Sequence, residues 1–436
     1  MIGQALAVGA DPEPPTWDLG RWIDVGLQNS PATRSAWARA QASREAIGEA
    51  RSAYYPDLIA EFRGGADRWY TPAATAPDNF NRLQATVALG IEYLLLDFGR
   101  RDADVKRTLA MFEAAGWSAR REMQAVVFAI QSAYFQHEAA ARQLEATRSQ
   151  LRFARLLDEQ IRKEVATGLR AEPELREAAA GLAAAEAAVA GADARLQNAA
   201  GRVRVAAGLP ANAPVRVAAA GPLPTSSPFR ADVNLLVSQA LALRPDIASA
   251  EANVVASEAA SRRAAADFYP EVRLEAEYVY SNFRYTARDG RVGGTFQENL
   301  NGYGAFLTVS WDIFDGFERI SKLRRRRADA EAARLDLEGS RLQSTGDVWT
   351  AYHDSLSTAS DLASSEISLA SAEEDYRARE AAAQTGLIDI TELSLAASRL
   401  AEARAVVASA VANYSTATAA LALAIGSPPA DTGTAR

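Results

Sequence analysis

Side chains that commonly carry enzyme chemistry are scarce in this sequence of 436 residues. The chain contains no cysteine, which excludes disulfides, zinc–thiolate sites and thiol nucleophiles. Its two histidines, His137 and His353, have no set of ligand residues nearby, so we expect no metal site. No nucleophile–base pattern and no phosphate-binding loop stands out, and the scattered acidic residues fit solvated helix faces. The sequence therefore predicts no catalytic residues, no cofactor and no enzyme.

The acidic residues with the most informative spacing follow two similar turn signals. In chain order these are Thr167-Gly168-Leu169 with Glu174, and Thr385-Gly386-Leu387 with Asp389 and Glu392. Glycine permits a tight turn, and Asp389 and Glu392 have the Asp-x-x-Glu spacing of a helix capping pair. Carboxylates in a first helical turn also complement the helix dipole. These residues alone predict two helices, each beginning just after a tight turn.

The sequence that contains these turns is an internal repeat, which occurs twice in the chain. Pro31 aligns with Pro245, which is an offset of 214 residues. From Asp97 onward, which aligns with Asp315, the offset is 218 residues. The four extra residues of the second copy therefore fall between Pro270 and Asp315. We predict an N-terminal segment at 1–30, repeat 1 at 31–210, a Pro-rich linker at 211–230, repeat 2 at 231–426 and a C-terminal tail at 427–436.

Each repeat changes from a helical to a strand pattern at a Tyr-Pro-acidic sequence. Pro56 and Pro270 end a helical stretch, because proline disfavours a helical conformation in the residue before it. The hydrophobic period then becomes two, which predicts strands with one apolar and one polar face. In the second strand of repeat 2 the apolar face runs from Tyr303 to Trp311, a span of about 26 Å. That span matches the apolar band of about 25 Å between the aromatic girdles of an outer-membrane barrel; the parallel strand of repeat 1 includes Tyr93.

Long helices follow the strands in both repeats. Residues 100–166 and 318–384 contain no proline and little glycine, and a helix of this length measures about 100 Å. In the returning helices an apolar residue recurs every seven positions with alanine three positions later, which implies left-handed coiled-coil packing with closely spaced axes. The apolar positions are Leu175, Leu182, Val189, Leu196 and Val203, then Leu393, Leu400, Val407, Tyr414 and Leu421. The predicted fold class is α+β and mainly α, with paired strands joined to very long helical hairpins.

Four strands cannot close a membrane barrel, which needs at least about eight. A homotrimer would supply twelve strands without exposed edges and twelve long helical segments that could close as a hollow cylinder. Strands packed on a soluble core are the alternative that the strand pattern alone leaves open. No run of about 18 apolar residues occurs, so we predict no transmembrane helix.

Charge and the chain's start add two further interpretations. The net charge of −8 argues against nucleic acid as a partner, and we interpret the run Arg324–Arg327 as a solvated or salt-bridged helix face. The N-terminus has no basic region and too short an apolar stretch for a full signal peptide, although Val8 and Ala10 resemble a cleavage site. We expect either a signal peptide truncated by a misassigned start or a plain flexible N-terminus.

As an ordered set, these residues resemble the TolC-type outer-membrane efflux and secretion channels. The resemblance runs from "TWDLGRWIDVGL" at Thr16 to Gly426 and rests on the Tyr-Pro junctions, the turns "LLDFGRR" and "IFDGFER", and the two hairpin turns. It implies a homotrimer with a 12-stranded β-barrel in the outer membrane of a Gram-negative bacterium and an α-helical barrel across the periplasm. It also implies a periplasmic adaptor and an inner-membrane transporter of RND, ABC or MFS type, which supplies the energy and selects the cargo.

The resemblance also assigns roles to the turns and to the acidic residues. Thr167-Gly168-Leu169 and Thr385-Gly386-Leu387 match the tip motif that engages the adaptor's helical hairpins. Glu392 lies where the family closes its periplasmic aperture, with Asp389 nearby and Glu174 as the counterpart in repeat 1. A ring of three carboxylates would favour cations. Capping of the helix N-terminus is the alternative role.

One residue departs from the family's aperture pattern, and one rival function is considered. Many relatives carry a further acid three residues after the aperture position, where this chain has Leu395. The rival function is a soluble, elongated coiled-coil structural or adaptor protein. Two matched hairpins, together with strands edged by the expected membrane-interface aromatics Tyr93, Tyr303 and Trp311, favour a channel in contact with outer-membrane lipid.

Overall fold

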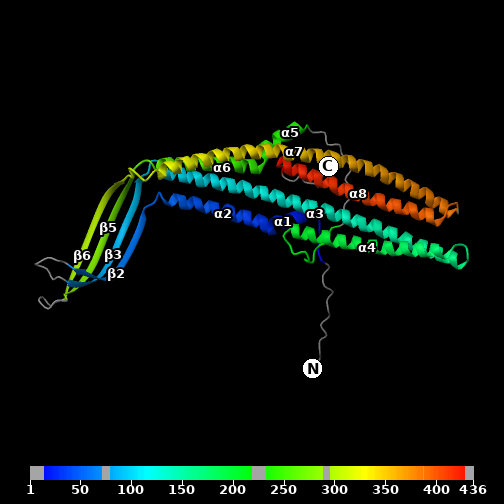
Figure 1. Ribbon diagram of the computed structural model, residues 1–436, viewed down its shortest axis with the longest axis horizontal. Coiled ribbons are helices and arrows are strands. Elements are labelled where there is room, and N and C mark those ends of the chain that lie inside the picture. The colour runs from blue at the N-terminus through cyan, green and yellow to red at the C-terminus, as the bar shows by residue number, and fades with distance from the viewer. Residues whose placement is uncertain (1–13, 71–78, 219–231, 288–294, 386, 428–436) are drawn as a thin grey trace, which may run out of the picture. The chain divides into compact units, whose positions relative to one another are not determined.

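The computed structural model describes residues 14–70, 79–218, 232–287, 295–385 and 387–427, where the same order of main elements occurs twice (Figure 1). The first series is α1 (Leu19–Asn29), α2 (Pro31–Ser52), β2 (Asp57–Tyr70), β3 (Asn79–Leu96), α3 (Arg100–Ala166) and α4 (Glu172–Ala206). The second is α5 (Val233–Leu243), α6 (Pro245–Ala266), β5 (Glu271–Ala287), β6 (Thr295–Ser310), α7 (Glu318–Gln384) and α8 (Ile390–Ile425). The mainly helical class predicted from the sequence is confirmed. The cleavage-site motif and most of the Pro-rich linker lie outside the described residues.

The chain divides into two compact units, which are described separately below. Unit 1 contains Met1–Arg39, Gly116–Ala248 and Glu338–Arg436, and unit 2 contains Ala40–Ala115 and Ser249–Leu337. The sequence did not predict β1 (Thr16–Trp17) and β4 (Arg216–Val217), which pair in parallel within unit 1. Two-residue strands are too short to give an alternating pattern, which explains why they were missed.

Unit 1 has two equivalent apolar clusters, one from each series of elements. In the first, Trp22 of α1, Ile130 of α3 and Val203 of α4 are fully buried. The second contains Leu236 of α5, Val348 of α7 and Leu421 of α8. These are the same positions in the two repeats, because the offsets are 214 for the first pair and 218 for the other two. Each cluster joins the short first helix of a repeat to its long hairpin.

Alanine supplies most of the buried side chains of the returning helices. The buried side chains of α4 are Ala178, Ala185, Ala192, Ala199, Ala200 and Val203. The same seven-residue spacing continues in α8 through Ala396 and Ala410. Among the larger residues of the heptad pattern, Leu175 and Leu182 of α4 are only half-buried, whereas Leu400, Val407 and Leu421 of α8 are buried. Small side chains at the seam let helix axes approach closely, as the alanine spacing predicted.

Helix α8 is, by length and composition alone, apolar enough to cross a membrane, although the sequence predicted no such helix. Its apolar residues have packing partners in unit 1 instead. Val407 and Val411 cluster with Leu362 of α7, and Leu421 lies in the cluster with α5. The high hydropathy therefore reflects an alanine-rich packing seam.

The sheet of unit 2 is antiparallel in the order β2-β3-β5-β6. The helices that precede it end at Ser52 and Ala266, three residues before the Tyr that precedes Pro56 or Pro270. In both copies a last tight turn follows, in which the Tyr55 N–H donates to the Ser52 carbonyl at 2.8 Å and the Tyr269 N–H to the Ala266 carbonyl at 3.1 Å. Proline thus ends the helix as predicted and starts the strand.

Gly208, at the end of α4, occupies a position with no room for a side chain. Its φ of +76° lies in the left-handed region, and an added Cβ would lie 2.9 Å from the backbone of Asn29 and Ser30. We expect Gly208→Ala to destabilise the protein by at least about 1 kcal/mol, because the left-handed strain adds to the backbone clash. Gly191→Ala is the matched control, since Gly191 is helical with open space around its Cβ position and alanine there should stabilise by up to about 1 kcal/mol. Thermal unfolding by circular dichroism measures both, and equal melting temperatures would contradict the prediction.

Candidate functional site

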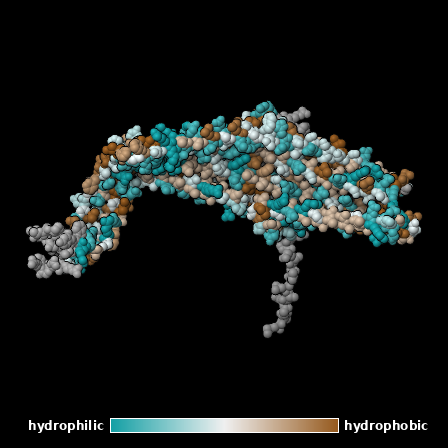
Figure 2. All heavy atoms as spheres, in the orientation of Figure 1, coloured by the Kyte–Doolittle hydropathy of each residue, from teal (hydrophilic) through white to brown (hydrophobic). Residues whose placement is uncertain are grey.

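One face of the sheet is a continuous apolar surface. The cross-strand pairs Val272–Val309, Leu274–Leu307 and Tyr278–Tyr303 place β5 and β6 side chains together on it. β2 and β3 extend the same face with Leu58, Ala60 and Phe62, and with Val87, Leu89, Ile91 and Tyr93. The described parts of the chain leave these side chains largely uncovered, and Leu307 is 64% exposed (Figure 2). The opposite face is polar and carries the ion pair between Glu92 and Arg273.

The predicted aromatic residues lie at the two ends of this apolar band. Tyr303 is 90% exposed, and the next residue on the same face of β6 is Asn301, followed by Asn299, which faces Asn282. At the other end, Trp311 follows β6 directly, and its indole N–H donates to the Phe268 carbonyl at 3.1 Å. Tyr93 is half-buried and pairs with Leu274.

The strands are longer than the sequence predicted. β6 continues eight residues beyond Tyr303 to Thr295, and β5 continues to Ala287. In this extension the face of the apolar band becomes polar, with Asn282, Arg284 and Asn299. Phe283, Tyr285 and Leu300 lie on the opposite face, so the alternation of the first half reverses while the backbone ladder continues. The apolar band therefore covers only the half of the sheet nearest the helices.

The hairpin turn between α3 and α4 has the geometry that its glycine predicted. Gly168 has φ +76°, its N–H donates to the Val165 carbonyl, and the Leu169 N–H donates to the Glu164 carbonyl at 2.8 Å. This pair of bonds is a Schellman motif, which ends a helix at a left-handed residue. In the second turn the Leu387 N–H donates to the Ala382 carbonyl at 2.9 Å, and Gly386 lies outside the described residues.

Both turns present one leucine to solvent beside a fixed threonine. Leu169 and Leu387 are each 78% exposed. The hydroxyls of Thr167 and Thr385 donate to carbonyls of the preceding helical turn. The described residues of each turn thus leave an apolar side chain exposed at its apex.

The acidic residues after the turns are held by arginines that sequence reasoning missed. Arg170 forms ion pairs with Glu164 at 2.6 Å, with Glu174 at 2.8 Å and with Asp389. We call these four residues the Arg170 cluster. It links the turn of the first hairpin to the start of α8, 219 residues away. The four-residue spacing of Arg170 and Glu174 was a local signal for one of its pairs, although Arg170 lies two residues before α4 begins at Glu172.

Glu392 has a separate partner. Arg379 of α7 contacts Glu392 at 3.2 Å and Asp375 at 2.9 Å. The Asp-x-x-Glu spacing of Asp389 and Glu392 predicted a side-chain cap. The structure forms no side-chain cap bond at the start of α8. Each carboxylate instead faces a guanidinium, which compensates its charge.

The Arg170 cluster sets the protonation of Asp389. Burial acts to raise the pKa of this carboxyl, but hydrogen bonds from Arg170 and Thr391 outweigh burial, so the pKa lies below its usual value. A lowered pKa in the folded state means that the ionised form stabilises the protein at neutral pH. That contribution is lost only as pH falls through the lowered pKa.

We expect Asp389→Asn to lower the melting temperature by a constant amount between pH 7 and pH 5. The difference from the wild type should shrink only below about pH 4, where an ordinary aspartate becomes protonated. Thermal unfolding across this pH range measures it. Asp361→Asn on the exposed side of α7 is the control and should leave the melting temperature close to that of the wild type. Loss of the Asp389→Asn effect already between pH 7 and pH 5 would show that Arg170 does not hold the carboxylate.

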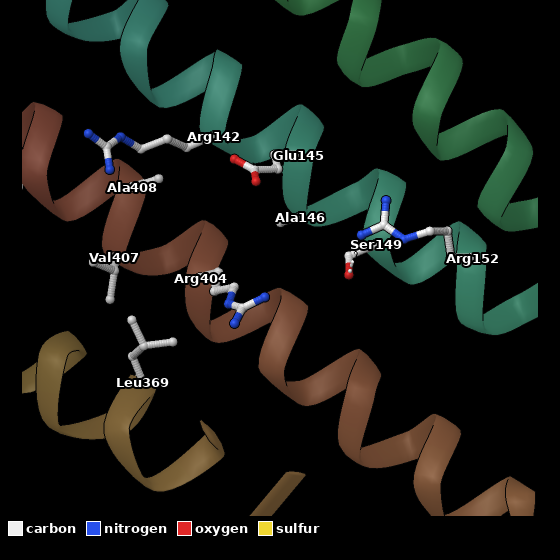
Figure 3. A pocket seen from close by; sticks show the side chains of 9 residues that line it. All are labelled: Arg142, Glu145, Ala146, Ser149, Arg152, Leu369, Arg404, Val407 and Ala408. Atoms are coloured by element: carbon white, nitrogen blue, oxygen red, sulfur yellow. Dashed lines mark hydrogen bonds between the residues drawn. The ribbon is translucent and has the colours of Figure 1, made fainter. Parts of the chain in front are cut away.

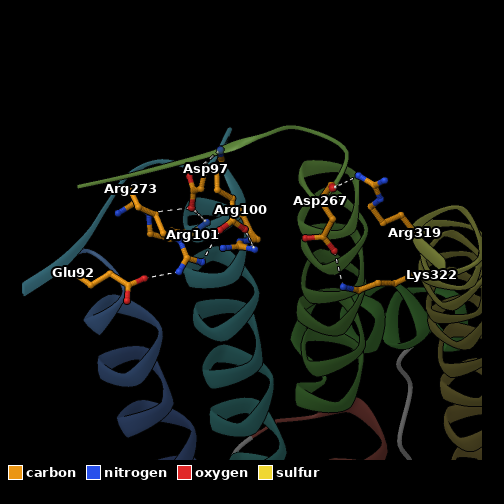
Figure 4. A network of polar contacts seen from close by, with 10 residues as sticks. Glu92, Asp97, Arg100, Arg101, Asp267, Arg273, Arg319 and Lys322 are labelled. Atoms are coloured by element: carbon orange, nitrogen blue, oxygen red, sulfur yellow. Dashed lines mark hydrogen bonds and ion pairs between the residues drawn. The ribbon is translucent and has the colours of Figure 1, made fainter. Parts of the chain in front are cut away.

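Each strand-to-helix turn contains an aspartate–arginine pair that binds the end of the preceding helix (Figure 4). Arg101 pairs with Asp97 at 3.0 Å and donates to the Ala53 and Leu94 carbonyls. In the second series, Arg319 pairs with Asp315 at 2.7 Å and donates to the Asp267 carbonyl at 3.3 Å. We call these two arrangements the junction clamps. They occupy equivalent positions in the repeats, at "LLDFGRR" and "IFDGFER".

A surface hollow of about 260 Å³ lies among α3, α7 and α8 of unit 1 (Figure 3). Its polar lining includes Arg142, Arg152 and Arg404, with Glu145 on the same wall. Ser149 accepts a hydrogen bond from Arg152, and the residues lining this hollow include no histidine to activate the serine hydroxyl. The hollow can attract an anion, but its lining does not form a nucleophile–base pair.

The two histidines have structural surroundings. Burial, with a further contribution from the charge of Arg204, lowers the pKa of His137 to about 4, so its ring is neutral at physiological pH. His353 is exposed and packs against the rings of Trp349 and Tyr352 at 4.7 and 5.3 Å. Within the described parts of the chain, no group of three or more His, Asp and Glu side chains could hold a metal ion.

Comparisons with known proteins agree on one architecture. A family model described as outer membrane efflux protein matches residues 22–209 and 236–427. Protein CyaE of Bordetella pertussis is 26% identical over 335 residues, which cover 76% of this chain and 68% of CyaE. The outer-membrane channel OprN superposes with a TM-score of 0.76 and 22% identity, covering 94% of this chain and 90% of OprN. The outer-membrane protein VceC of Vibrio cholerae gives a TM-score of 0.72 and 20% identity, with coverage of 94% and 96%.

Proposed function

The chain belongs to the outer membrane efflux protein family, and we propose that it is the channel subunit of a tripartite efflux pump or type I secretion system. Its family and structural neighbours are outer-membrane channels rather than enzymes. The observation that carries the proposal is the apolar band on the sheet. An uncovered apolar face of this size is a liability in water, whereas the outside of a membrane barrel requires it.

A homotrimer would complete the barrel. In the four-stranded sheet of one chain, β2 and β6 are the two edges, and unpaired edge groups cost several kcal/mol each in lipid. Three copies joined edge to edge give twelve strands and remove every edge. The polar face with Glu92 and Arg273 would then line the lumen. The helices α3, α4, α7 and α8 of three chains would form the α-helical barrel in the periplasm.

The two hairpin turns are the surfaces that we assign to the periplasmic adaptor. Their exposed apices, Leu169 and Leu387, suit insertion between the helices of a partner hairpin. The adaptor would connect the channel to an inner-membrane transporter of RND, ABC or MFS type. That transporter supplies the energy, and the channel acts as a passive exit duct.

The acidic residues beside the turns are the proposed periplasmic aperture. In a trimer, Asp389, Glu392 and Glu174 would each occur three times around the axis. Glu392 is the most exposed of the three side chains at 57%, which makes it the main candidate for attracting cations. The Arg170 cluster would hold the aperture narrow by joining the two hairpins of each subunit.

Extraction and conductance of the exported full-length protein test the function. We expect a detergent-dependent trimer that conducts ions in a planar lipid bilayer. The alternative, a soluble elongated coiled-coil protein, predicts release as a monomer by a high-salt wash and no conductance. Membrane fractionation followed by size-exclusion chromatography separates the two outcomes.

A further inference from the structure

The run Arg324–Arg327 lies just beyond the end of the sheet. It occupies the second and third turns of α7, which begins eight residues after β6 ends. At 1.5 Å per residue, Arg324 lies about 9 Å and Arg327 about 14 Å along the axis from Glu318. Helical side chains lean toward the N-terminus of their helix, which here is the end nearer the sheet.

Most of this charge is uncompensated. Arg326 pairs with Asp329, but Arg324, Arg325 and Arg327 are exposed and form no ion pair with any residue that the structure describes. We call these three residues the basic patch. The sequence suggested a solvated or salt-bridged face, and only Arg326 has the salt bridge.

The equivalent part of repeat 1 is compensated. At the offset of 218, Lys106 and Arg107 stand in place of Arg324 and Arg325. They pair with Asp102 at 2.7 Å and Asp104 at 3.0 Å. Repeat 2 replaces these two aspartates with Ile320 and Lys322. Residues 318–327 therefore carry six basic and one acidic side chain, against four basic and two acidic in residues 100–109.

The turn before the basic patch exposes large apolar side chains. Trp311 is 58%, Ile313 83%, Phe314 73% and Phe317 63% exposed. Phe317 has φ +70°, and Phe98 in the equivalent turn of repeat 1 has φ +52°. A bulky residue in the left-handed region is strained by about 1–3 kcal/mol, and glycine would remove that strain. In repeat 1 the ring of Phe98 stacks on Tyr269 at 5.1 Å, whereas Phe317 contacts only the similarly exposed Phe314 among the aromatic rings that the structure describes. The strained position in repeat 2 therefore keeps an aromatic ring largely at the surface.

We propose that the turn at Trp311–Phe317 and the basic patch together bind the headgroups of anionic phospholipids in the periplasmic leaflet of the outer membrane. The inference rests on the proposed barrel. The aromatic side chains would lie at the level of the glycerol and ester groups, as interfacial aromatics do. The headgroup layer is about 5–8 Å thick, so arginines that lean toward the sheet reach its phosphates. Clusters of basic residues beside a membrane-spanning segment attract anionic lipid in this way.

The placement favours lipid over an acidic surface of a second subunit. Four consecutive arginines on an α-helix point in four directions about 100° apart. Whichever side of α7 contacts another subunit, the run also presents guanidinium groups on the remaining sides. The aromatic residues just before the same helix add a contact that an acidic protein surface would not need.

Native mass spectrometry of the detergent-solubilised full-length protein tests the proposal. We expect phosphatidylglycerol to bind more tightly than phosphatidylcholine, and the preference to fall in about 0.5 M NaCl, where the Debye length is roughly 4 Å. The triple variant R324Q/R325Q/R327Q should bind phosphatidylglycerol about 100-fold more weakly, since each basic residue contributes about fivefold. The matched control K106Q/R107Q removes charges that Asp102 and Asp104 already compensate and should keep the preference.

Two more measurements distinguish a lipid site from a phosphate site and from a contact between subunits. R324K/R325K/R327K should retain the preference, and inorganic phosphate should not displace the lipid. Equal binding of both lipids, an unchanged preference in the glutamine variant, or full displacement by phosphate would each overturn the proposal. If the glutamine variant loses the trimer while the lysine variant keeps it, the arginines would instead be assigned to a contact between subunits. Conductance of the wild type is recorded in parallel. A protein that does not conduct would reject the proposed barrel and, with it, the lipid site. A protein that conducts but shows no lipid preference would reject the lipid site alone.

Discussion

Leu307→Arg is expected to remove the protein from the outer membrane. Leu307 lies in the middle of the apolar band, between Tyr303 and Trp311, and pairs with Leu274. An arginine at the lipid midplane of a barrel costs about 2–4 kcal/mol, and a trimer would carry three of them. The sum is comparable to the whole stability of many folded domains. Membrane fractionation and the yield of trimer resistant to sodium dodecyl sulfate measure the loss.

Phe306→Arg is the matched control. Phe306 is the adjacent residue of the same strand, but it lies on the opposite face and pairs with Glu275. An arginine there would face the proposed lumen beside a carboxylate, so we expect trimer yield near that of the wild type. The rival soluble protein predicts that Leu307→Arg is tolerated or improves solubility. Equal trimer yields from the two variants would reject the assignment of the faces.

Arg170→Gln is expected to open the periplasmic end of the channel. The substitution removes every ion pair of the Arg170 cluster at once, including the link to Asp389. Exposed ion pairs contribute up to about 1 kcal/mol each, and three subunits would lose the link together. A shift of about 3 kcal/mol changes the ratio of open to closed channels about 100-fold. Single-channel recording in planar bilayers measures the open probability and the conductance.

Arg176→Gln removes the same charge further along α4 and serves as the control. Arg176 is 82% exposed and lies 4.0 Å from Glu172, a pair too weak to hold two hairpins together. Asp389→Asn should reproduce most of the Arg170→Gln effect, and the double variant should add little to either. Additive effects of Arg170→Gln and Asp389→Asn would show that the two residues act separately.

The long elements could be predicted because their signals are local and repeated. Pro56 and Pro270 mark the change from helix to strand, and the seven-residue spacing of Leu393 and its successors marks a packed helix. The duplication doubled each signal, since the same residue types recur at offsets of 214 and 218. The heptad seam and the apolar face of β6 accordingly lie where the sequence placed them.

Contacts between distant residues could not be predicted in the same way. Arg170 and Asp389 are 219 residues apart, and no local sequence pattern at either position indicates a contact with the other. The side-chain cap predicted for Asp389 was wrong for the same reason. The Asp389 carboxylate pairs with the guanidinium of the distant Arg170 instead of capping the start of α8. The extended halves of β5 and β6 were missed because the apolar residues change face there. Phe283, Tyr285 and Leu300 lie opposite the apolar band, so the alternation that predicted the first half is interrupted.

The junction clamps have a mechanical consequence. Arg101 binds carbonyls from the end of α2 and from β3 with one guanidinium, while its own backbone belongs to α3. Arg319, at the start of α7, makes the corresponding bond to the carbonyl of Asp267, which follows the end of α6. A planar group with several fixed donors resists both stretching and torsion more than a flexible linker does. The Arg101 junction should therefore act as a stiff coupling, so that torque applied to α3 passes into β3 instead of being absorbed at the turn, whereas Arg319 couples α7 to the end of α6.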